Sequence, residues 1–165
     1  MDFKDFERLS APRFGGIRGF MDLLKFNLKY YRMPEFKHHD ITQKIIGAAM
    51  RVHATLGNGF QEVIYQRALQ IEFKEICLSF EREYNMKVYY KGHEIGERRV
   101  DFLVEGKIMV ELKALIKLEN VHLAQAKNYL EAYNVEVGLL LNFGAISLEF
   151  KRLGNNKYDA GLRNA

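Results

Sequence analysis

The segment RRVDFLVEGKIMVELKAL, residues 98–115, constrains the fold of this 165-residue chain more than any other. Its apolar residues recur with a period of two on both sides of a central Gly, which is typical of a β-hairpin. The first strand is expected to place on one face Val100, Phe102 and Val104, and on the other Arg99, Asp101 and Leu103. The second strand separates in the same way into Ile108, Val110, Leu112 and Ala114 on one face and Met109, Glu111, Lys113 and Leu115 on the other. We therefore predict a half-buried sheet that carries charged side chains on one face.

The turn of this hairpin decides which charged residues meet. The segment 105–107, Glu-Gly-Lys, supplies the turn. A loop of odd length, such as these three residues, pairs Val104 with Ile108 and therefore Asp101 with Glu111. A two-residue loop would set Asp101 opposite Val110 and separate the carboxylates. The odd loop predicts that two carboxylates and the Lys113 ammonium lie on one side of the sheet.

Two interpretations of this charged cluster stay open at this point. Charges on a half-buried sheet are costly unless they are paired or bound to a metal, and carboxylate oxygens suit a hard cation such as Mg²⁺. The alternative is an ordinary solvent-facing hairpin, on which cross-strand ion pairs contribute little to stability.

The rest of the chain predicts a mixed sheet flanked by helices. Helical periodicity marks residues 40–57, 60–76 and 119–133, with Asp40 able to cap the first helix. Alternating or continuous apolar runs mark strands at 80–90, 94–104, 107–115, 135–144 and 146–153. The order is ααβββαββ, and the third helix is long enough to connect two parallel strands. The expected fold class is therefore α/β (α+β).

The helices add candidate site residues. Glu62 lies in the first turn of the second helix, three residues before Tyr65 on the same face. It is either a first-turn residue that suits the helix dipole or a third acidic group directed at the hairpin. Gln125 and Tyr129 are four apart on one face of the third helix.

Composition and segment boundaries limit the function classes. The formal net charge is +4, of which residues 1–39 hold eight Lys/Arg and five Asp/Glu, so the remainder is close to neutral. The single cysteine, Cys77, excludes an internal disulfide and a cysteine-based zinc site, and it fits a cytoplasmic location. No apolar run approaches a membrane span, so we expect no membrane partner.

We expect three segments in the chain. Residues 1–39 form an N-terminal extension that contributes little to the fold, residues 40–153 form the domain, and residues 154–165 form a flexible tail. Met33 is a plausible true start of the protein. The N-terminal extension could alternatively be a basic-aromatic arm that touches nucleic acid or a membrane.

Five short motifs in this order resemble one known family. They are Gly59-x-x-Glu62-x-x-Tyr65, Arg99-x-Asp101-Phe102, Val110-Glu111-Leu112-Lys113, Gln125-x-x-x-Tyr129-Leu130 and Leu141-Asn142-Phe143-Gly144. Together they resemble the GxxExxY proteins of the PD-(D/E)XK nuclease superfamily, which has the restriction-endonuclease-like fold. The resemblance covers roughly residues 40–152. It departs from the superfamily motif at Val100, which stands where a proline would precede Asp101.

The resemblance implies a role for each matching residue. Asp101 and Glu111 would be Mg²⁺ ligands, with Mn²⁺ as a substitute, and Lys113 would orient or activate the attacking water. Glu62 would bind the metal directly or through water. The residues implied to bind or orient the substrate are Gln125, Tyr129, Arg99 and Tyr65.

The resemblance and the charged cluster together favour a Mg²⁺-dependent nuclease. Its expected substrate is nucleic acid, DNA rather than RNA, and its expected type is an exonuclease or repair nuclease. The alternative is a catalytically inactive module of the same fold that binds nucleic acid or a protein partner. A homo-oligomer is compatible with either interpretation.

Overall fold

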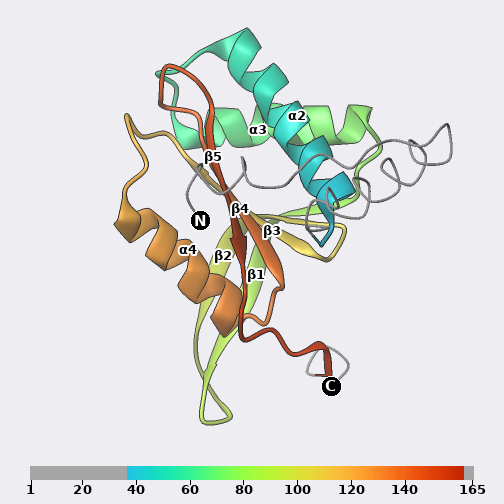
Figure 1. Ribbon diagram of the computed structural model, residues 1–165, viewed down its shortest axis with the longest axis vertical. Helices are drawn as coiled ribbons and strands as arrows, with labels where there is room; N and C mark the ends of the chain where they lie inside the picture. Colours follow the sequence, from blue (N-terminus) through green and yellow to red (C-terminus); the bar gives the residue numbers. More distant parts are fainter. Residues whose placement is uncertain (1–36, 162–165) are drawn as a thin grey trace, which may run out of the picture. The chain divides into compact units, whose positions relative to one another are not determined.

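The computed structural model describes residues 37–161, and everything below concerns these residues. The elements in chain order are α2 (His39–Leu56), α3 (Glu62–Glu75), β1 (Phe80–Tyr90), β2 (His93–Val104), β3 (Ile108–Lys113), α4 (Asn120–Ala132), β4 (Val137–Asn142) and β5 (Glu149–Gly154). This order, shown in Figure 1, confirms the predicted ααβββαββ arrangement. The expectations for residues 1–36, including the possible start at Met33, lie outside the described residues.

The five strands form one mixed sheet in the order β1-β2-β3-β4-β5. Neighbouring strands are antiparallel except β3 and β4, which are parallel and are connected through α4. A parallel pair needs a long crossover, so the helix between these two strands fixes this part of the topology. The predicted mixed sheet with flanking helices is confirmed, and it is consistent with a restriction-endonuclease-like fold.

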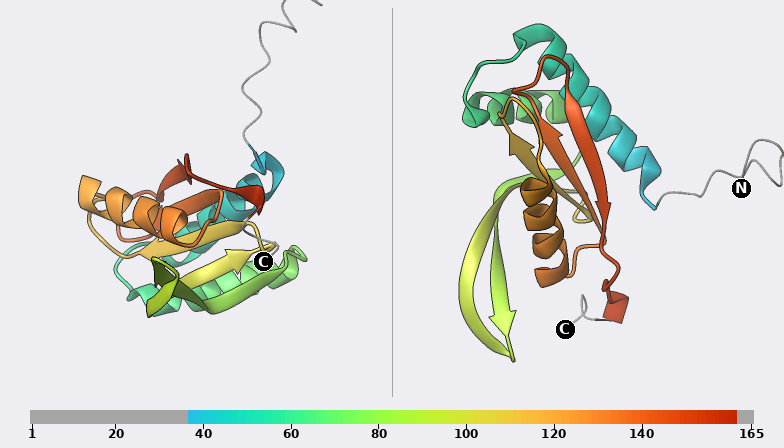
Figure 2. Two further views of the ribbon diagram at one scale, coloured as in Figure 1. Left: turned by 90° about the horizontal axis from the view of Figure 1, so that it is seen from below. Right: turned by 60° about the vertical axis from the view of Figure 1, so that its left-hand side comes forward.

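Helices cover both faces of the sheet (Figures 1 and 2). α2 and α3 pack on one face against the main hydrophobic core, which includes Ile45, Phe73, Phe102 and Leu141. Leu130 of α4 packs on the opposite face, in a smaller cluster with Met86, Val100, Met109 and Val135. β4 lies between these layers and all six of its residues are buried, as its continuous apolar sequence predicted.

Two details of the helices differ from the prediction. α2 begins at His39, and its N-terminal cap is His38 in the left-handed region at φ 59°, with no capping side chain. Asp40 therefore does not cap the helix; it lies inside the first turn, where the helix dipole still favours its charge. α3 begins at Glu62 rather than at the predicted residue 60, and its Ile71 side chain is 59% exposed.

β2 separates from β3 near the middle of β3, and this separation positions the site. The three-residue turn sets the expected register, with Val104 opposite Ile108, but the pairing between β2 and β3 ends at Phe102 and Val110. The predicted pairing of Asp101 with Glu111 is therefore not part of the ladder. Beyond this point β2 pairs only with β1, and the two strands continue as a ribbon away from the sheet (Figures 1 and 2).

The alternation of β2 also breaks at the same point. Val100 packs in the α4 cluster, whereas Phe102 and Val104 pack in the core under α2 and α3. The expectation that these three residues share one face is therefore wrong. The strand turns over at Asp101, beside Glu83 of β1, whose φ of 55° interrupts the neighbouring strand. Ribbons of two strands twist more strongly than wide sheets, which accounts for the turn where β2 loses its third-strand neighbour.

The residues after β5 that the structure describes are hydrogen-bonded to the domain. Asn155 donates its side-chain N–H to the Leu130 carbonyl at 3.0 Å, and its backbone N–H to the Glu136 carbonyl at 2.9 Å. Asp159 donates its backbone N–H to the Asn134 side chain at 2.8 Å. The part of the expected flexible tail up to residue 161 thus contacts α4 and the loop before β4. Within residues 37–161, no helix is long and apolar enough to cross a bilayer.

Candidate functional site

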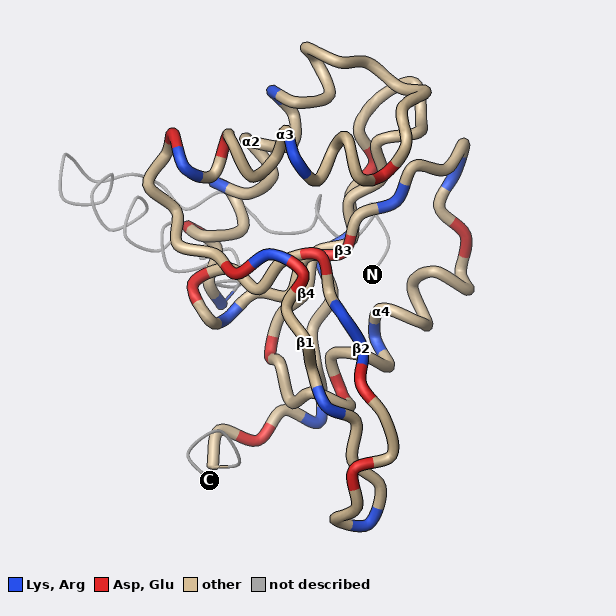
Figure 3. The backbone as a smooth tube through the Cα atoms, turned by 180° about the vertical axis from the view of Figure 1, so that it is seen from behind, with Lys and Arg blue, Asp and Glu red and all other residues tan. Residues whose placement is uncertain are grey.

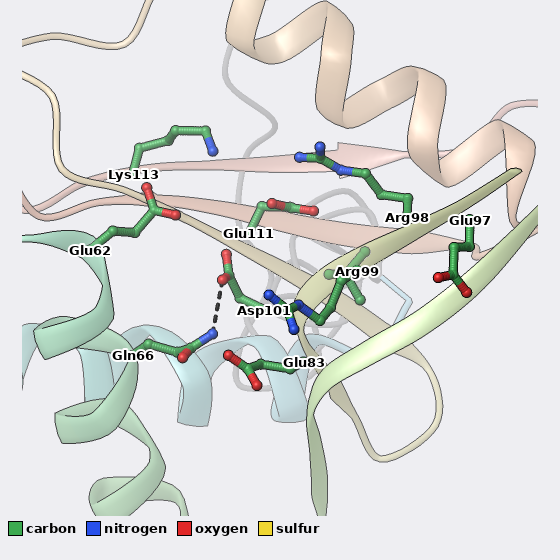
Figure 4. A pocket seen from close by; sticks show the side chains of 10 residues that line it. Glu62, Gln66, Glu83, Glu97, Arg98, Arg99, Asp101, Glu111 and Lys113 are labelled. Carbon is green, nitrogen blue, oxygen red and sulfur yellow. Dashed lines mark hydrogen bonds between the residues drawn. The ribbon is translucent and has the colours of Figure 1, made fainter.

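A pocket of about 360 Å³ opens where β2 separates from β3 (Figure 4). Its lining comes from the first turns of α3 and from β1, β2 and β3. The lining residues are Glu62, Gln66, Glu83, Glu97, Arg98, Arg99, Val100, Asp101, Glu111 and Lys113. The structure therefore brings together the predicted site residues Glu62, Arg99, Asp101, Glu111 and Lys113 in one place.

Asp101 is held in a defined orientation. Its Oδ2 accepts the backbone N–H of Leu112 at 2.8 Å, and its Oδ1 accepts the Nε2–H of Gln66 at 3.0 Å. Burial raises the pKa of Asp101, while the Leu112 N–H and the Lys113 charge act in the opposite direction. Gln66, which the sequence analysis did not identify, links α3 to this carboxylate; four residues after Glu62, it is one helical turn further along the same face.

Glu111 is the most unusual carboxylate in the pocket. Its side chain projects from β3 into the interior, and the residue is only 4% exposed. Its Oε1 has no hydrogen-bond partner among the described residues. Burial, and then the negative charge of Asp101, raise the pKa of Glu111 to about 7. A buried carboxylate of this kind requires a proton or a cation at its unpaired oxygen.

Lys113 and Glu62 approach the two carboxylates from different elements. Lys113 is the last residue of β3, and Glu62 is the first residue of α3. Burial raises the pKa of Glu62, and the nearby Lys113 charge partly offsets this effect. Among the described residues, Lys113 forms no ion pair within 4.0 Å, so its ammonium is available to a bound molecule.

Arg98 is a pocket residue that the sequence analysis missed. Strict alternation places it on the face of Val100, away from Asp101, and only the turn of β2 lets both side chains reach the same pocket. Its positive charge lowers the pKa values of Glu62, Asp101 and Glu111. Its guanidinium lies over the ring of Tyr129, 4.5 Å from the centroid, and its Nε has no hydrogen-bond partner among the described residues.

Three predicted site residues do not line this pocket. Gln125 is exposed on α4. Tyr129 is half-buried and reaches the pocket only through its contact with Arg98. Tyr65 is fully buried: its hydroxyl donates to the Gly57 carbonyl at 3.0 Å and accepts the Phe60 N–H at 3.1 Å. Tyr65 thus fixes the loop that precedes Glu62.

The family assignment rests on a match to almost the whole described domain. A family model described as the PD-(D/E)XK nuclease superfamily matches residues 39–153. The chain belongs to the PD-(D/E)XK nuclease superfamily. This membership indicates nuclease activity and nucleic-acid binding, and nucleases of the superfamily usually use divalent metals.

A solved structure is similar to this chain. The crystal structure of SSO0001 is similar to this chain at 16% sequence identity and a TM-score of 0.46, over 86% of this chain and 78% of that one. No curated protein matches the sequence.

The pocket can hold a divalent cation, as PD-(D/E)XK nucleases usually do, through two carboxylates. Within residues 37–161, no three His, Cys, Asp or Glu side chains are arranged to hold a metal ion together. Mg²⁺, however, is commonly bound through only one or two carboxylates and keeps several waters. Glu111, whose buried Oε1 has no partner among residues 37–161, and Asp101 beside it provide such a pair. The donor set therefore suits a cation held by two carboxylates.

Proposed function

We propose that this member of the superfamily is a Mg²⁺-dependent nuclease that hydrolyses phosphodiester bonds of DNA. The observation that carries the proposal is the buried Glu111 carboxylate, whose Oε1 has no partner among residues 37–161, beside Asp101 and Lys113. A buried carboxylate of this kind is costly unless a proton or a cation satisfies it, and at neutral pH a cation can take the place of the proton. A cation and a phosphate bound in the pocket would supply the missing partners.

Four residues of the pocket have proposed roles at the metal and the attacking water. Asp101 and Glu111 would hold Mg²⁺, or Mn²⁺ as a substitute, and Glu62 would bind it directly or through water. A cation held there would supply charge neutralisation of the phosphate and a lower pKa for a water. Lys113 donates a hydrogen bond to the attacking water and stabilises the negative charge that develops on the phosphate.

Two arginines complete the proposed substrate contacts. Arg98 and Arg99 line the pocket beside the carboxylates. A guanidinium can bind phosphate oxygens with two parallel hydrogen bonds. These local cations matter because acidic and basic residues are interspersed along the β1–β2 ribbon (Figure 3), so the ribbon does not offer the DNA backbone a uniformly basic face.

The GxxExxY assignment within the superfamily is part of the proposal. Its physical basis is that Gly59, Glu62 and Tyr65 act together: Gly59 has a φ of 106°, which favours glycine. Tyr65 then holds this loop through its two hydrogen bonds and places Glu62 at the pocket. We further propose, from the sequence, that the enzyme is an exonuclease or a repair nuclease and that it acts in the cytoplasm.

The test is a cleavage assay with linear, circular, single-stranded and duplex DNA in Mg²⁺, Mn²⁺ or EDTA. We expect cleavage that requires a divalent cation, is lost in Asp101→Ala and persists in Glu75→Ala, which removes an exposed carboxylate outside the pocket. Cleavage of linear but not circular DNA would identify an exonuclease. Metal-independent cleavage, or equal activity in both variants, would contradict the proposal.

A second candidate is a catalytically inactive module that binds nucleic acid or a protein. The observation that favours it is that both oxygens of Asp101 already accept hydrogen bonds within the fold. This alternative predicts that DNA binds equally well with and without divalent cations and that no substrate is cleaved. The same assay, combined with a binding measurement, separates the two candidates.

A further inference from the structure

A second groove lies between β1 and the C-terminal end of α4. It has a volume of about 530 Å³, and its lining includes three tyrosines, one methionine and one lysine: Tyr84, Tyr89, Tyr133, Met86 and Lys87. β1 forms one wall, and the end of α4 with the two residues after it forms the other. No role proposed above uses this groove.

The groove and the candidate active site share no lining residue, but a chain of side-chain contacts links them. The guanidinium of Arg98, which lines the active-site pocket, lies 4.5 Å from the centroid of the Tyr129 ring. Tyr129 in turn contacts Tyr133, with 6.3 Å between the ring centroids, and Tyr133 lines the groove. Across the ribbon, Met86 of the groove pairs with Arg98. Arg98, Tyr129 and Tyr133 thus form a connected row of side chains from the pocket to the groove.

Polar groups along this path lack partners. The Tyr133 hydroxyl is buried and makes no hydrogen bond within residues 37–161, and burial raises its pKa. The Nε of Arg98 is also buried without a partner in this part of the chain. Buried donors without acceptors cost free energy, so these two groups would gain hydrogen bonds from a ligand whose binding draws the Arg98 and Tyr133 side chains toward it. At the outer end, Tyr89 is 57% exposed and presents an aromatic surface.

We propose that this groove binds the unpaired nucleotides of a single-stranded DNA whose adjacent phosphodiester enters the active-site pocket. Bases stack on tyrosine rings without regard to sequence, and cations beside them contact the backbone. Tyr89, Tyr84 and Tyr133 supply the rings. Arg98 lies at the pocket end, and Lys87, which also bonds Glu94 at 2.8 Å, lies further along the ribbon. The proposal rests on the nuclease function for the identity of the ligand.

The experiment measures binding of a fluorescein-labelled oligothymidylate to the full-length protein by anisotropy. EDTA is present throughout, so that binding is read without metal-dependent cleavage. Tyr89→Ala removes an exposed ring of the groove. Tyr90→Ala is the matched control, because Tyr90 is the next residue, is 60% exposed and does not line the groove. Tyr89→Phe keeps the ring and removes only the hydroxyl.

We expect Tyr89→Ala to weaken binding by about tenfold, the scale of one lost base–aromatic stack, and Tyr89→Phe and Tyr90→Ala to bind like the wild type. Equal losses in Tyr89→Ala and Tyr90→Ala, no loss in Tyr89→Ala, or a loss in Tyr89→Phe equal to that in Tyr89→Ala would each overturn the proposal. So would tighter binding of a blunt duplex than of the single strand.

The binding result is independent of the cleavage result. If Tyr89→Ala weakens binding but the protein cleaves no DNA, the proposed groove function stands and the proposed nuclease function is refuted. If the protein cleaves DNA with a divalent cation but Tyr89→Ala binds DNA normally, the nuclease function stands and the groove function is refuted.

Discussion

Asp101 accepts the backbone N–H of Leu112 at 2.8 Å, and this bond lies at the position where β2 stops pairing with β3. A regular ladder would satisfy this part of β3 with backbone carbonyls of β2. Because the strands separate, a carboxylate takes over one of those bonds and is itself held in place. The same separation opens the pocket in which Glu111 and Lys113 lie. The separation of β2 from β3 therefore both orients the Asp101 carboxylate and opens the pocket around it.

The first prediction concerns Lys113. Lys113→Ala should leave Mg²⁺ or Mn²⁺ binding nearly unchanged, because both carboxylates remain, and should lower the cleavage rate by about 10²-fold or more. Asp101→Ala should weaken metal binding itself. Calorimetric titration with the metal, beside cleavage rates, measures both effects. Lys117→Ala, an exposed lysine outside the pocket, is the control. Full activity of Lys113→Ala would refute the catalytic role.

The second prediction concerns the pH dependence of stability without metal. The pKa of Glu111 is about 7 in the folded protein against 4.5 for an ordinary glutamate. Between these values the folded state holds more protons than the unfolded state, so the free energy of unfolding falls as pH rises, by about 3 kcal/mol for this group. Glu111→Gln should therefore be more stable than the wild type at pH 8. Its stability should still fall with rising pH, but less steeply, because the pKa values of Asp101 and Glu62 are also raised.

Denaturant unfolding at several pH values in EDTA measures this difference. Addition of Mg²⁺ at pH 8 should stabilise the wild type and leave Glu111→Gln nearly unchanged, because the cation takes the place of the proton. A wild type whose stability rises between pH 5 and 7 would contradict the prediction.

The third prediction concerns Gly144, just after β4. A Cβ at this position would lie 2.4 Å from the Leu115 N and 2.5 Å from the Ala114 C, and backbone atoms cannot move aside easily. Gly144→Ala should cost about 3 kcal/mol of stability and displace the end of β3, which carries Lys113. Gly96→Ala is the matched control, since nothing lies within 4 Å of its added Cβ. Thermal unfolding of both variants tests the difference, and equal stability would show that the backbone adapts.

The fourth prediction concerns Tyr65, which the sequence suggested as a substrate-orienting residue. Because the buried Tyr65 hydroxyl makes two hydrogen bonds to the loop between α2 and α3, Tyr65→Phe should cost about 2 kcal/mol of stability. Cleavage should fall through misplacement of Glu62. Tyr90→Phe, on an exposed strand, should change neither quantity. Unchanged stability with a large loss of cleavage would instead support direct contact between Tyr65 and the substrate.

The fifth prediction concerns residues 1–32, which lie outside the described residues and remain a prediction from sequence. Their composition differs from that of the domain, so a chain beginning at Met33 should melt within a few degrees of the full chain. Differential scanning calorimetry of both chains measures this. A large drop in melting temperature, or insolubility, would show that the segment supports the fold.

The sequence by itself determined the elements and their order. Periodicity located every helix and strand of residues 37–161, since it reports which side chains each element can bury. The three-residue turn set the Val104–Ile108 register, and the crossover length set the parallel pair β3–β4. The sequence also predicted that Asp101, Glu111 and Lys113 lie together, because charged residues in otherwise apolar strands are conspicuous, and the family resemblance added Glu62 to this group.

Only the tertiary structure decided how these residues meet. Local alternation assumes that a strand keeps both neighbours, whereas β2 loses β3 at Asp101 and turns over there. That turn carries Arg98 to the pocket, and α3 brings Gln66 to Asp101. The tertiary structure also buries Glu111, whose Oε1 has no hydrogen-bond partner among the described residues. Burial and partner geometry depend on contacts between segments far apart in the chain, and no local pattern encodes them.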